Sequence, residues 1–192
     1  MNFERIESAI DVPRMQAARV ALIGSGASVG LASDLVRSGL GHIDLFDFDV
    51  VAPENLARQA HLAGHVGLPK VEALARQLRA INPPVVISCQ QTDFTQLTEA
   101  EWKSQFGGVD LLVFATDRFT AQAKGNELAL CCGIPALWIG LYAGGQGGEV
   151  IFWHPNLPAC YRCLCTNRYA AHAAEQSLGR SIDPASVGAT IF

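Results

Sequence analysis

The sequence predicts an α/β fold, a Rossmann-like doubly wound sheet that is mostly parallel and has helices on both faces. Three observations support this prediction. Short apolar runs of strand length recur along the chain, helical patterns separate several of them, and a glycine-rich turn follows the first run. The 192 residues are 49% hydrophobic and 17% charged, so the chain can bury a sizeable core. We therefore expect a single domain over residues 1–192.

The first apolar run, residues 19–23, is followed by the turn Gly24-Ser-Gly-Ala-Ser-Val-Gly30. Gly24 and Gly26 allow the tight turn and the close backbone approach that a bound phosphate requires. An expected helix over residues 31–38 would direct its N-terminal amides and its dipole at that phosphate. The spacing to Gly30 is G-x-G-x-x-x-G instead of G-x-G-x-x-G, so the turn alone is a weak nucleotide signal.

The second apolar run, residues 43–46, ends at Asp47. This acid follows the glycines by about 20 residues, where a carboxylate can bond ribose hydroxyls. Residues 71–81 place their apolar side chains on one helical face, and Asn82 and Pro83 end that helix. The pattern so far is strand, helix, strand, helix, as a parallel sheet requires.

The second half of the chain continues the alternation. We expect three short buried strands at residues 85–87, 111–114 and 136–139, a helix at 119–132, and a polar connection at 88–108 with a short helix near 99–106. The run Gly144-Gly-Gln-Gly-Gly148 is either a plain loop between strands or a flexible segment beside the nucleotide and substrate site.

Charge and hydropathy argue against nucleic-acid and membrane partners. The formal net charge is −4 and the pI is about 5.7, whereas nucleic-acid binders usually carry a basic surface. We therefore do not expect a nucleic-acid partner. No apolar run approaches the length of a membrane span, and the first residues lack an apolar signal region. The expectation is a cytoplasmic protein without a membrane partner.

Nine ordered segments resemble the ThiF/MoeB family, the adenylation-domain superfamily that includes the ubiquitin-activating enzymes. They run in family order from about residue 19 to residue 165, and so many ordered pieces are hard to match by chance. The segments are the glycine turn, Ser38-Gly-Leu-Gly41, Asp47-Phe-Asp-Val50, Asn55-x-x-Arg58-Gln59, Gly67-x-Pro-Lys70, Ile81-Asn-Pro83, Ala115-Thr-Asp117, Gly148-Glu-Val150 and Pro158-Ala-Cys-Tyr-Arg-Cys163.

The resemblance implies binding of ATP and Mg²⁺ and adenylation of a ubiquitin-like or sulfur-carrier protein. The C-terminal carboxylate of that partner would attack the α-phosphate and release pyrophosphate. Such catalysis depends mostly on positioning and on electrostatic stabilisation of the phosphate oxygens. By motif, Asp47 would hold the ribose, Arg58 and Lys70 the triphosphate, and Asp117 the metal, with Asn55 and Gln59 as polar support and Gly24, Gly26, Gly30 and Asp49 in the nucleotide site.

Each of these residues also has a structural interpretation when taken alone. An aspartate can cap a helix or turn, Arg58 can be a surface ion-pair partner, and Lys70 can simply begin the helix that follows. Together, and in family order, they favour the functional interpretation. Asp117 departs from the family pattern, because Arg118 follows it where the family usually has Asn, and a positive charge there would oppose a magnesium ion.

The cysteines give an incomplete metal motif. Cys160 and Cys163 have C-x-x-C spacing, and in the family such a pair joins a second C-x-x-C to hold structural zinc. The second pair is absent, although Cys165 lies close in sequence and His154 or His172 could complete a tetrahedral set. Cys160 and Cys163 are thus candidate ligands of a Zn²⁺ ion. The other three cysteines lie in or beside apolar segments and are expected to be reduced thiols.

The family resemblance also implies a homodimer in which an N-terminal arginine of one subunit reaches the nucleotide of the other. Arg5 is our preferred candidate over Arg14. Family members continue beyond the first C-x-x-C, whereas only residues 164–192 follow it here. We expect either a truncated or divergent member, or a site completed by a neighbouring subunit, and a mobile 164–192 tail if no zinc fixes it.

Two other functions remain open. An NAD-dependent oxidoreductase would explain the glycines and Asp47, but not Arg58, Lys70 and Asp117, and no Tyr-x-x-x-Lys pair is present for proton transfer. A non-catalytic nucleotide-binding partner subunit would suit the short C-terminal part, although such partners tend to lose the phosphate-binding residues that this chain keeps.

Overall fold

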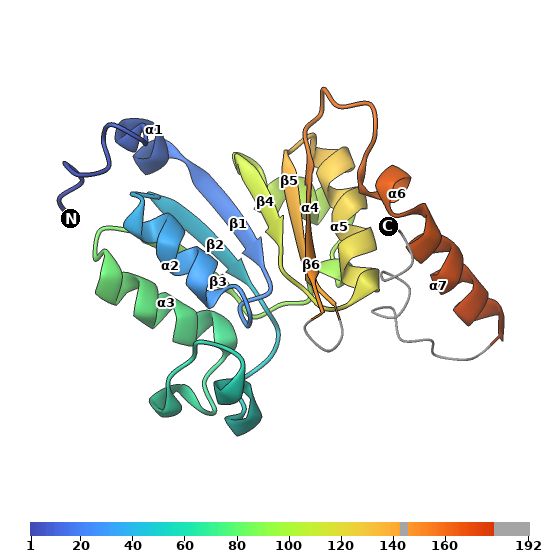
Figure 1. The fold of residues 1–192 in the computed structure, drawn as a ribbon, viewed down its shortest axis with the longest axis horizontal. Coiled ribbons are helices and arrows are strands. Elements are labelled where there is room, and N and C mark those ends of the chain that lie inside the picture. The colour runs from blue at the N-terminus through green and yellow to red at the C-terminus, as the bar shows by residue number, and fades with distance from the viewer. Residues whose placement is uncertain (143–145, 179–192) are drawn as a thin grey trace.

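The computed structural model describes residues 1–142 and 146–178, which form one six-stranded sheet (Figure 1). The strand order is β3-β2-β1-β4-β5-β6. The first five strands are parallel, and β6 is antiparallel to β5. The predicted α/β, mostly parallel fold is confirmed. The strands are β1 (Arg19–Ile23), β2 (His42–Phe46), β3 (Val86–Gln90), β4 (Leu111–Phe114), β5 (Ala136–Leu141) and β6 (Gly148–Trp153).

Helices pack on both faces of this sheet, each through its apolar side. On one face, α2 and α3 pack with β1 and β2 around Val36, Leu45 and Leu74. On the other face, α4 and α5 enclose an aromatic core that includes Phe114 and Trp138. Figure 1 shows α2 and α3 together on one side of the molecule and α5 to α7 on the other. The α-helices are α1 (Val12–Ala17), α2 (Val29–Arg37), α3 (Lys70–Ile81), α4 (Glu99–Gln105), α5 (Phe119–Cys132), α6 (Tyr161–Leu164) and α7 (Thr166–Leu178); the short 3₁₀ helices are η1 (Pro53–Ala57), η2 (Ala63–His65) and η3 (Phe94–Gln96).

The third predicted strand needs two corrections. It is not buried, because β3 is the edge strand of the sheet and Val86 is 57% exposed. It also runs on to Gln90, into the stretch predicted to be a polar connection. Polar side chains are tolerated there because an edge strand pairs through its backbone on one side and faces solvent on the other.

The order of the strands reverses around β1. The chain moves from β1 out to β2 and β3 and then returns to place β4 on the other side of β1. In open α/β sheets, ligands bind at such a switch point, beyond the carboxyl ends of the strands. The carboxyl ends of β1, β2 and β4 therefore define where a site is expected.

Residues after the C-x-x-C motif form α6 and α7, and α7 is tied to the sheet by polar contacts. The Arg168 guanidinium pairs with the Glu149 carboxylate of β6 and contacts the Tyr161 hydroxyl at 3.3 Å. Tyr169 packs edge to face on Phe119 of α5, with ring centroids 5.0 Å apart. The segment up to residue 178 is thus helical and packed, while residues 143–145 and 179–192 lie outside the described part of the chain.

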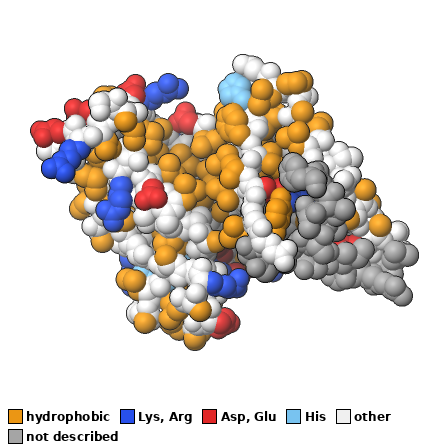
Figure 2. Space-filling model, viewed as in Figure 1, with side chains coloured by type: hydrophobic (Ala, Val, Ile, Leu, Met, Phe, Trp, Pro, Cys, Tyr) orange, Lys and Arg blue, Asp and Glu red, His pale blue; other side chains and the backbone are white. Residues whose placement is uncertain are grey.

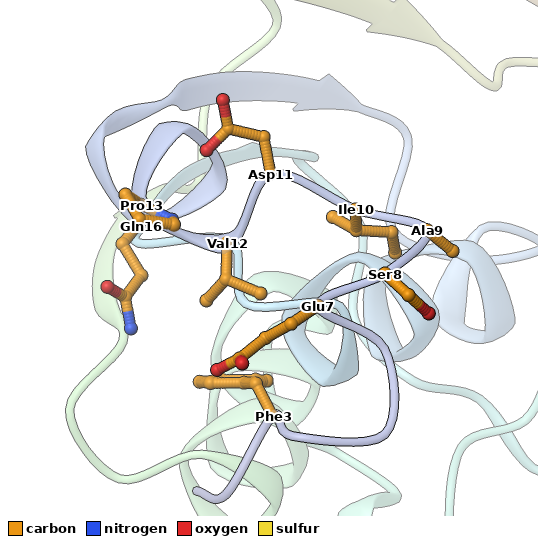
Figure 3. A pocket seen from close by; sticks show the side chains of 9 residues that line it. All are labelled: Phe3, Glu7, Ser8, Ala9, Ile10, Asp11, Val12, Pro13 and Gln16. Atoms are coloured by element: carbon orange, nitrogen blue, oxygen red, sulfur yellow. The ribbon is translucent and has the colours of Figure 1, made fainter.

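A cavity of about 820 Å³ lies between the N-terminal segment and α1, lined by Phe3, Glu7 and Gln16 among others (Figure 3). One residue separates α1 from the start of β1, so this cavity is at the amino edge of the sheet, opposite the switch point. Among the described residues, no helix is long and apolar enough to cross a membrane.

Candidate functional site

The glycine turn begins directly at the carboxyl end of β1. Gly24 has φ +97°, and its N–H donates to the Phe46 carbonyl oxygen at 2.8 Å. A Cβ at Gly24 would lie 2.6 Å from the carbonyl oxygen of Ala115, at the end of β4. The position therefore requires glycine for two reasons, the backbone angle and the close neighbouring strand.

The other two predicted glycines differ from each other. A Cβ at Gly26 would meet the Gln59 side-chain amide at 2.8 Å, so a larger residue here would displace the end of that flexible side chain. Gly30 lies in α2, and a Cβ added there would have no heavy atom within 4 Å. Packing within this chain does not require glycine at residue 30, and its role in nucleotide binding stays a prediction.

Asp47 fixes the turn from the end of β2. Its carboxylate accepts the Ser25 N–H at 2.7 Å and the Asp49 N–H at 2.9 Å. One side chain thus joins the first turn to the segment after β2. Because each carboxylate oxygen has two lone pairs, Asp47 retains capacity to accept a further hydrogen bond from a ligand hydroxyl.

Lys70 lies beside this segment and is held there by the backbone. The Lys70 N–H donates to the Asp49 carbonyl oxygen at 2.9 Å, and an antiparallel bridge pairs Val50 with Pro69. The Lys70 ammonium contacts the Asp49 carboxylate at 2.9 Å, with the lysine side chain 9% exposed and the aspartate side chain 50% exposed. A mostly buried positive charge, paired with Asp49, therefore lies in the segment that follows Asp47.

The Asn55-x-x-Arg58-Gln59 motif lies in and just after η1. Asn55 is buried, and its side-chain oxygen accepts the Ala52 N–H at 3.0 Å, so it stabilises this short helix. Gln59 packs its side chain on Gly26. Arg58 is exposed, and no ion pair to its guanidinium occurs among the described residues.

Asp117 is exposed just beyond the carboxyl end of β4, two residues after the carbonyl that contacts Gly24. The preceding residue, Thr116, has its methyl carbon 3.3 Å from the position that a Cβ at Gly24 would take. Gln122 of α5 donates to the Thr116 carbonyl oxygen at 2.9 Å and so fixes this loop. The predicted metal ligand therefore lies at the same sheet edge as the glycine turn.

Unpartnered polar atoms surround the glycine turn. Ten buried side-chain N and O atoms lack a hydrogen-bond partner in the described chain, and five of these belong to residues at this turn. Buried polar atoms are normally paired, so these atoms are available for hydrogen bonds with a bound polar ligand. The five atoms are the Ser25 hydroxyl, the Gln59 carbonyl oxygen, both ring nitrogens of His61 and the Thr116 hydroxyl.

Three of these residues were not among the predicted site residues. Ser25 and Thr116 lie inside the motifs that predicted the site, so the motifs were a usable signal for them. His61 had none, because a lone histidine in an irregular segment carries no pattern. Burial is the main cause that lowers the pKa of His61; the nearby His65 and Lys70 add to this effect, while the Ser25 backbone and Asp47 oppose it, so the neutral imidazole is favoured.

Arg5 and the pair Cys160 and Cys163 do not lie at the glycine turn of their own chain. Arg5 is exposed in the N-terminal segment, where Phe3 lies 3.5 Å from the position that a Cβ at Gly39 would take, and this segment is at the amino edge of the sheet. The sulfur atoms of Cys160 and Cys163 are 3.7 Å apart at α6, which contacts α5. In the described part of the chain, no group of three or more His, Cys, Asp or Glu side chains is placed to bind a metal.

The Cys160 thiol, at the start of α6, has a pKa below the ordinary value for cysteine. Burial alone would raise its pKa, but hydrogen bonds from Cys163, Arg162 and Asn126 outweigh burial and leave the pKa below its ordinary value. In contrast, burial raises the pKa of Cys89 to about 11, with Glu72 adding to the effect. Cys160 is thus more readily ionised than Cys89.

The geometry fits a polyphosphate ligand. The turn presents backbone amides at the start of α2, Lys70 supplies positive charge, and Asp47 offers a hydrogen-bond acceptor on the same edge. A plain dinucleotide site needs only the turn and the acid. The additional positive charge of Lys70 favours a ligand with a higher negative charge.

Comparison with known proteins agrees with this geometry. A family model described as ThiF family matches residues 1–191. The chain is 32% identical to ubiquitin-like modifier-activating enzyme 5 of Drosophila mojavensis, with 94% of this chain and 48% of the relative covered. It is 31% identical to the sulfur carrier protein adenylyltransferase of Thermus thermophilus, covering 79% of this chain and 56% of the relative. The chain thus spans about half the length of the curated relatives it matches.

Solved structures give the same fold. E. coli MccB, crystallised with AMPCPP and MccA, superposes with a TM-score of 0.71 at 22% identity, covering 91% of this chain and 52% of that one. E. coli tRNA N6-threonylcarbamoyladenosine dehydratase TcdA, in complex with AMP, has a TM-score of 0.64 at 28% identity, covering 75% and 60%. The first similarity concerns the fold alone.

Proposed function

The chain belongs to the ThiF family, and we propose that it binds ATP and adenylates the C-terminal carboxylate of a ubiquitin-like or sulfur-carrier protein. The observation that supports this proposal is a glycine turn lined by unpartnered polar atoms, with Asp47 bonded to the Ser25 N–H of the turn and Lys70 paired with Asp49 in the segment after β2. Relatives named as adenylyltransferases, and a TcdA structure with bound AMP, support it.

In the proposed reaction, a carboxylate oxygen of the partner attacks the α-phosphorus of ATP. A new carboxyl–phosphate bond forms, the bond to the pyrophosphate leaving group breaks, and its electrons stay on pyrophosphate. Lys70 and Arg58 would neutralise the phosphate oxygens in the transition state, while Asp47 would accept hydrogen bonds from the ribose. Backbone amides at the start of α2 would bind a phosphate group.

Magnesium would be held at Asp117. Mg²⁺ is commonly bound by one or two carboxylates together with substrate phosphates. The exposed carboxylate of Asp117, beyond the carboxyl end of β4, matches this preference. Bound Mg²⁺ would neutralise phosphate charge. The protein's part is to fix the carboxylate at the end of β4, next to the Thr116 backbone that Gln122 holds.

Pyrophosphate release tests the activity directly. The chain should release pyrophosphate from ATP and Mg²⁺ when a carrier protein with a free C-terminal carboxylate is added. The same carrier with an amidated C-terminus is the control, because it lacks the nucleophile. ATP binding without pyrophosphate release from any of a panel of carriers would instead favour the non-catalytic partner subunit.

We also propose that the protein is a homodimer that pairs through one face of β5 and β6. Val150 and Phe152 are 67% and 51% exposed and lie opposite Ile139 and Leu137 of β5, on the side of the sheet that α2 occupies elsewhere. Figure 2 shows hydrophobic side chains over the middle of the molecule, where β4 to β6 lie in Figure 1. Contiguous exposed apolar patches often mark protein–protein contact surfaces.

Replacing Phe152 by Glu is therefore expected to produce monomers, because a charge would be buried in the interface. Light scattering at high micromolar concentration measures this. The matched control is Leu130→Glu, which changes a 49% exposed residue on α5 and should leave the dimer intact. A monomeric unaltered chain would contradict the proposed dimer and the role of Arg5 that depends on it.

For zinc, the described residues provide only part of a site. The 3.7 Å separation of the two sulfur atoms suits two thiolates on one Zn²⁺, yet a structural site needs four ligands. Residues 179–192 contain no Cys or His that could complete it. We predict less than stoichiometric zinc in the purified chain by elemental analysis. One zinc per chain, lost in Cys160→Ser, would show this prediction to be wrong.

A further inference from the structure

We propose that Arg118 is a phosphate-binding residue that increases selectivity for ATP over AMP; this inference rests on the proposed function. The residue follows Asp117 at the end of β4, and its guanidinium carbon lies 5.5 Å from the centre of the Phe48 ring, which follows Asp47 at the end of β2.

This contact joins residues that follow two of the strand ends at the candidate site, those of β2 and β4. β1 lies between β2 and β4 in the sheet, and the glycine turn starts at the carboxyl end of β1. Because neighbouring strands are about 4.8 Å apart, the ends of β2 and β4 are separated by roughly 10 Å. The Arg118 side chain and the Phe48 ring meet across that distance, so the charge of Arg118 lies between the carboxyl ends of β2 and β4.

The charge of Arg118 is available to a ligand. The residue is exposed, and in the part of the chain that the structure describes its guanidinium makes no ion pair. Its contact with Phe48, itself 43% exposed, is a weak surface cation–π interaction. A phosphate can form stronger, bidentate hydrogen bonds with the same group.

Local stability does not explain arginine at this position. Arg118 is the N-cap of α5, its carbonyl oxygen accepts the Ala121 and Gln122 N–H groups at 3.1 Å each, and its side chain caps nothing. Asn or Asp would cap the helix, and a positive charge opposes the helix dipole. A residue that is unfavourable for its local structure, such as an arginine at a helix N-terminus, is typical of a functional site.

The test is calorimetric titration with ATP and with AMP for the unaltered chain and for Arg118→Asn, without Mg²⁺, so that repulsion between Arg118 and a magnesium ion at Asp117 does not enter the comparison. Asparagine should cap α5 and raise Tm, yet reduce the ratio of ATP to AMP affinity about tenfold or more by removing a charge-assisted phosphate contact. Arg118→Lys should retain part of the ratio, because lysine keeps the charge but not the bidentate hydrogen bonds. Arg37→Asn, which changes an exposed arginine at the end of α2, should retain all of it.

The outcomes separate this inference from the proposed function. An unchanged ratio in Arg118→Asn, with ATP binding intact, would overturn the role of Arg118 alone. If Arg118 only covered Phe48, then Arg118→Asn and Phe48→Ala would weaken ATP and AMP equally, which would also overturn it. Absence of ATP binding by the unaltered chain would overturn the proposed function as well.

Discussion

Replacing Gly24 by alanine is expected to abolish measurable ATP binding and to lower the free energy of unfolding by about 2–4 kcal/mol. The added Cβ would lie 2.6 Å from the Ala115 carbonyl oxygen, and alanine disfavours the observed φ of +97°. Relief of that clash must move the turn away from β4 or separate β1 from β4. Urea denaturation measures the stability, and calorimetry with ATP measures the binding.

Gly30→Ala is the matched control for this variant. Residue 30 lies in α2, and an added Cβ would meet nothing within 4 Å, so alanine should keep or slightly raise the free energy of unfolding. If Gly30→Ala destabilises the chain as much as Gly24→Ala, the steric explanation of the turn is incorrect. If Gly30→Ala is stable but loses ATP, the third glycine acts directly in nucleotide binding.

The second large effect is expected for Lys70→Ala, which should weaken ATP binding by about 1.5–3 kcal/mol, the cost of one charge-assisted contact. Its effect on the free energy of unfolding should be smaller, because the Asp49 side chain that loses its partner is half exposed and stays hydrated. Calorimetry and thermal unfolding on the same preparation separate the two quantities.

Two further variants make this result interpretable. Lys70→Arg keeps the positive charge and should recover part of the affinity, while Lys103→Ala removes an exposed lysine of α4 and should change neither quantity. Equal losses of binding and stability in Lys70→Ala would indicate that Lys70 mainly holds the segment after β2 in place.

Hydrophobic pattern was enough to predict most of the sheet. The apolar runs became β1, β2, β4 and β5, and the helix at 119–132 has the predicted limits, because long apolar patterns leave few alternatives. The pattern could not show that β3 is an edge strand or that β6 pairs antiparallel with β5. Both properties depend on neighbours that are distant in the sequence.

The candidate site was predictable to the extent that it lies in motifs. Family order identified Asp47 and Lys70; the fold joins Asp47 to the glycine turn through the Ser25 N–H and pairs Lys70 with Asp49. Sequence could not reveal that His61 is buried there, or that Arg118 reaches Phe48, because each depends on the path of an irregular segment. The roles of Arg58, Asp117 and Arg5 stay predictions.

Calorimetric titration of the unaltered chain with ATP, AMP and NAD, each with Mg²⁺, tests the central claim most directly. A site built from Asp47, Lys70 and the glycine turn should bind ATP at least tenfold more tightly than NAD, because the charge of Lys70 favours a triphosphate. Tighter binding of NAD than of ATP would contradict the adenylation proposal and favour an oxidoreductase.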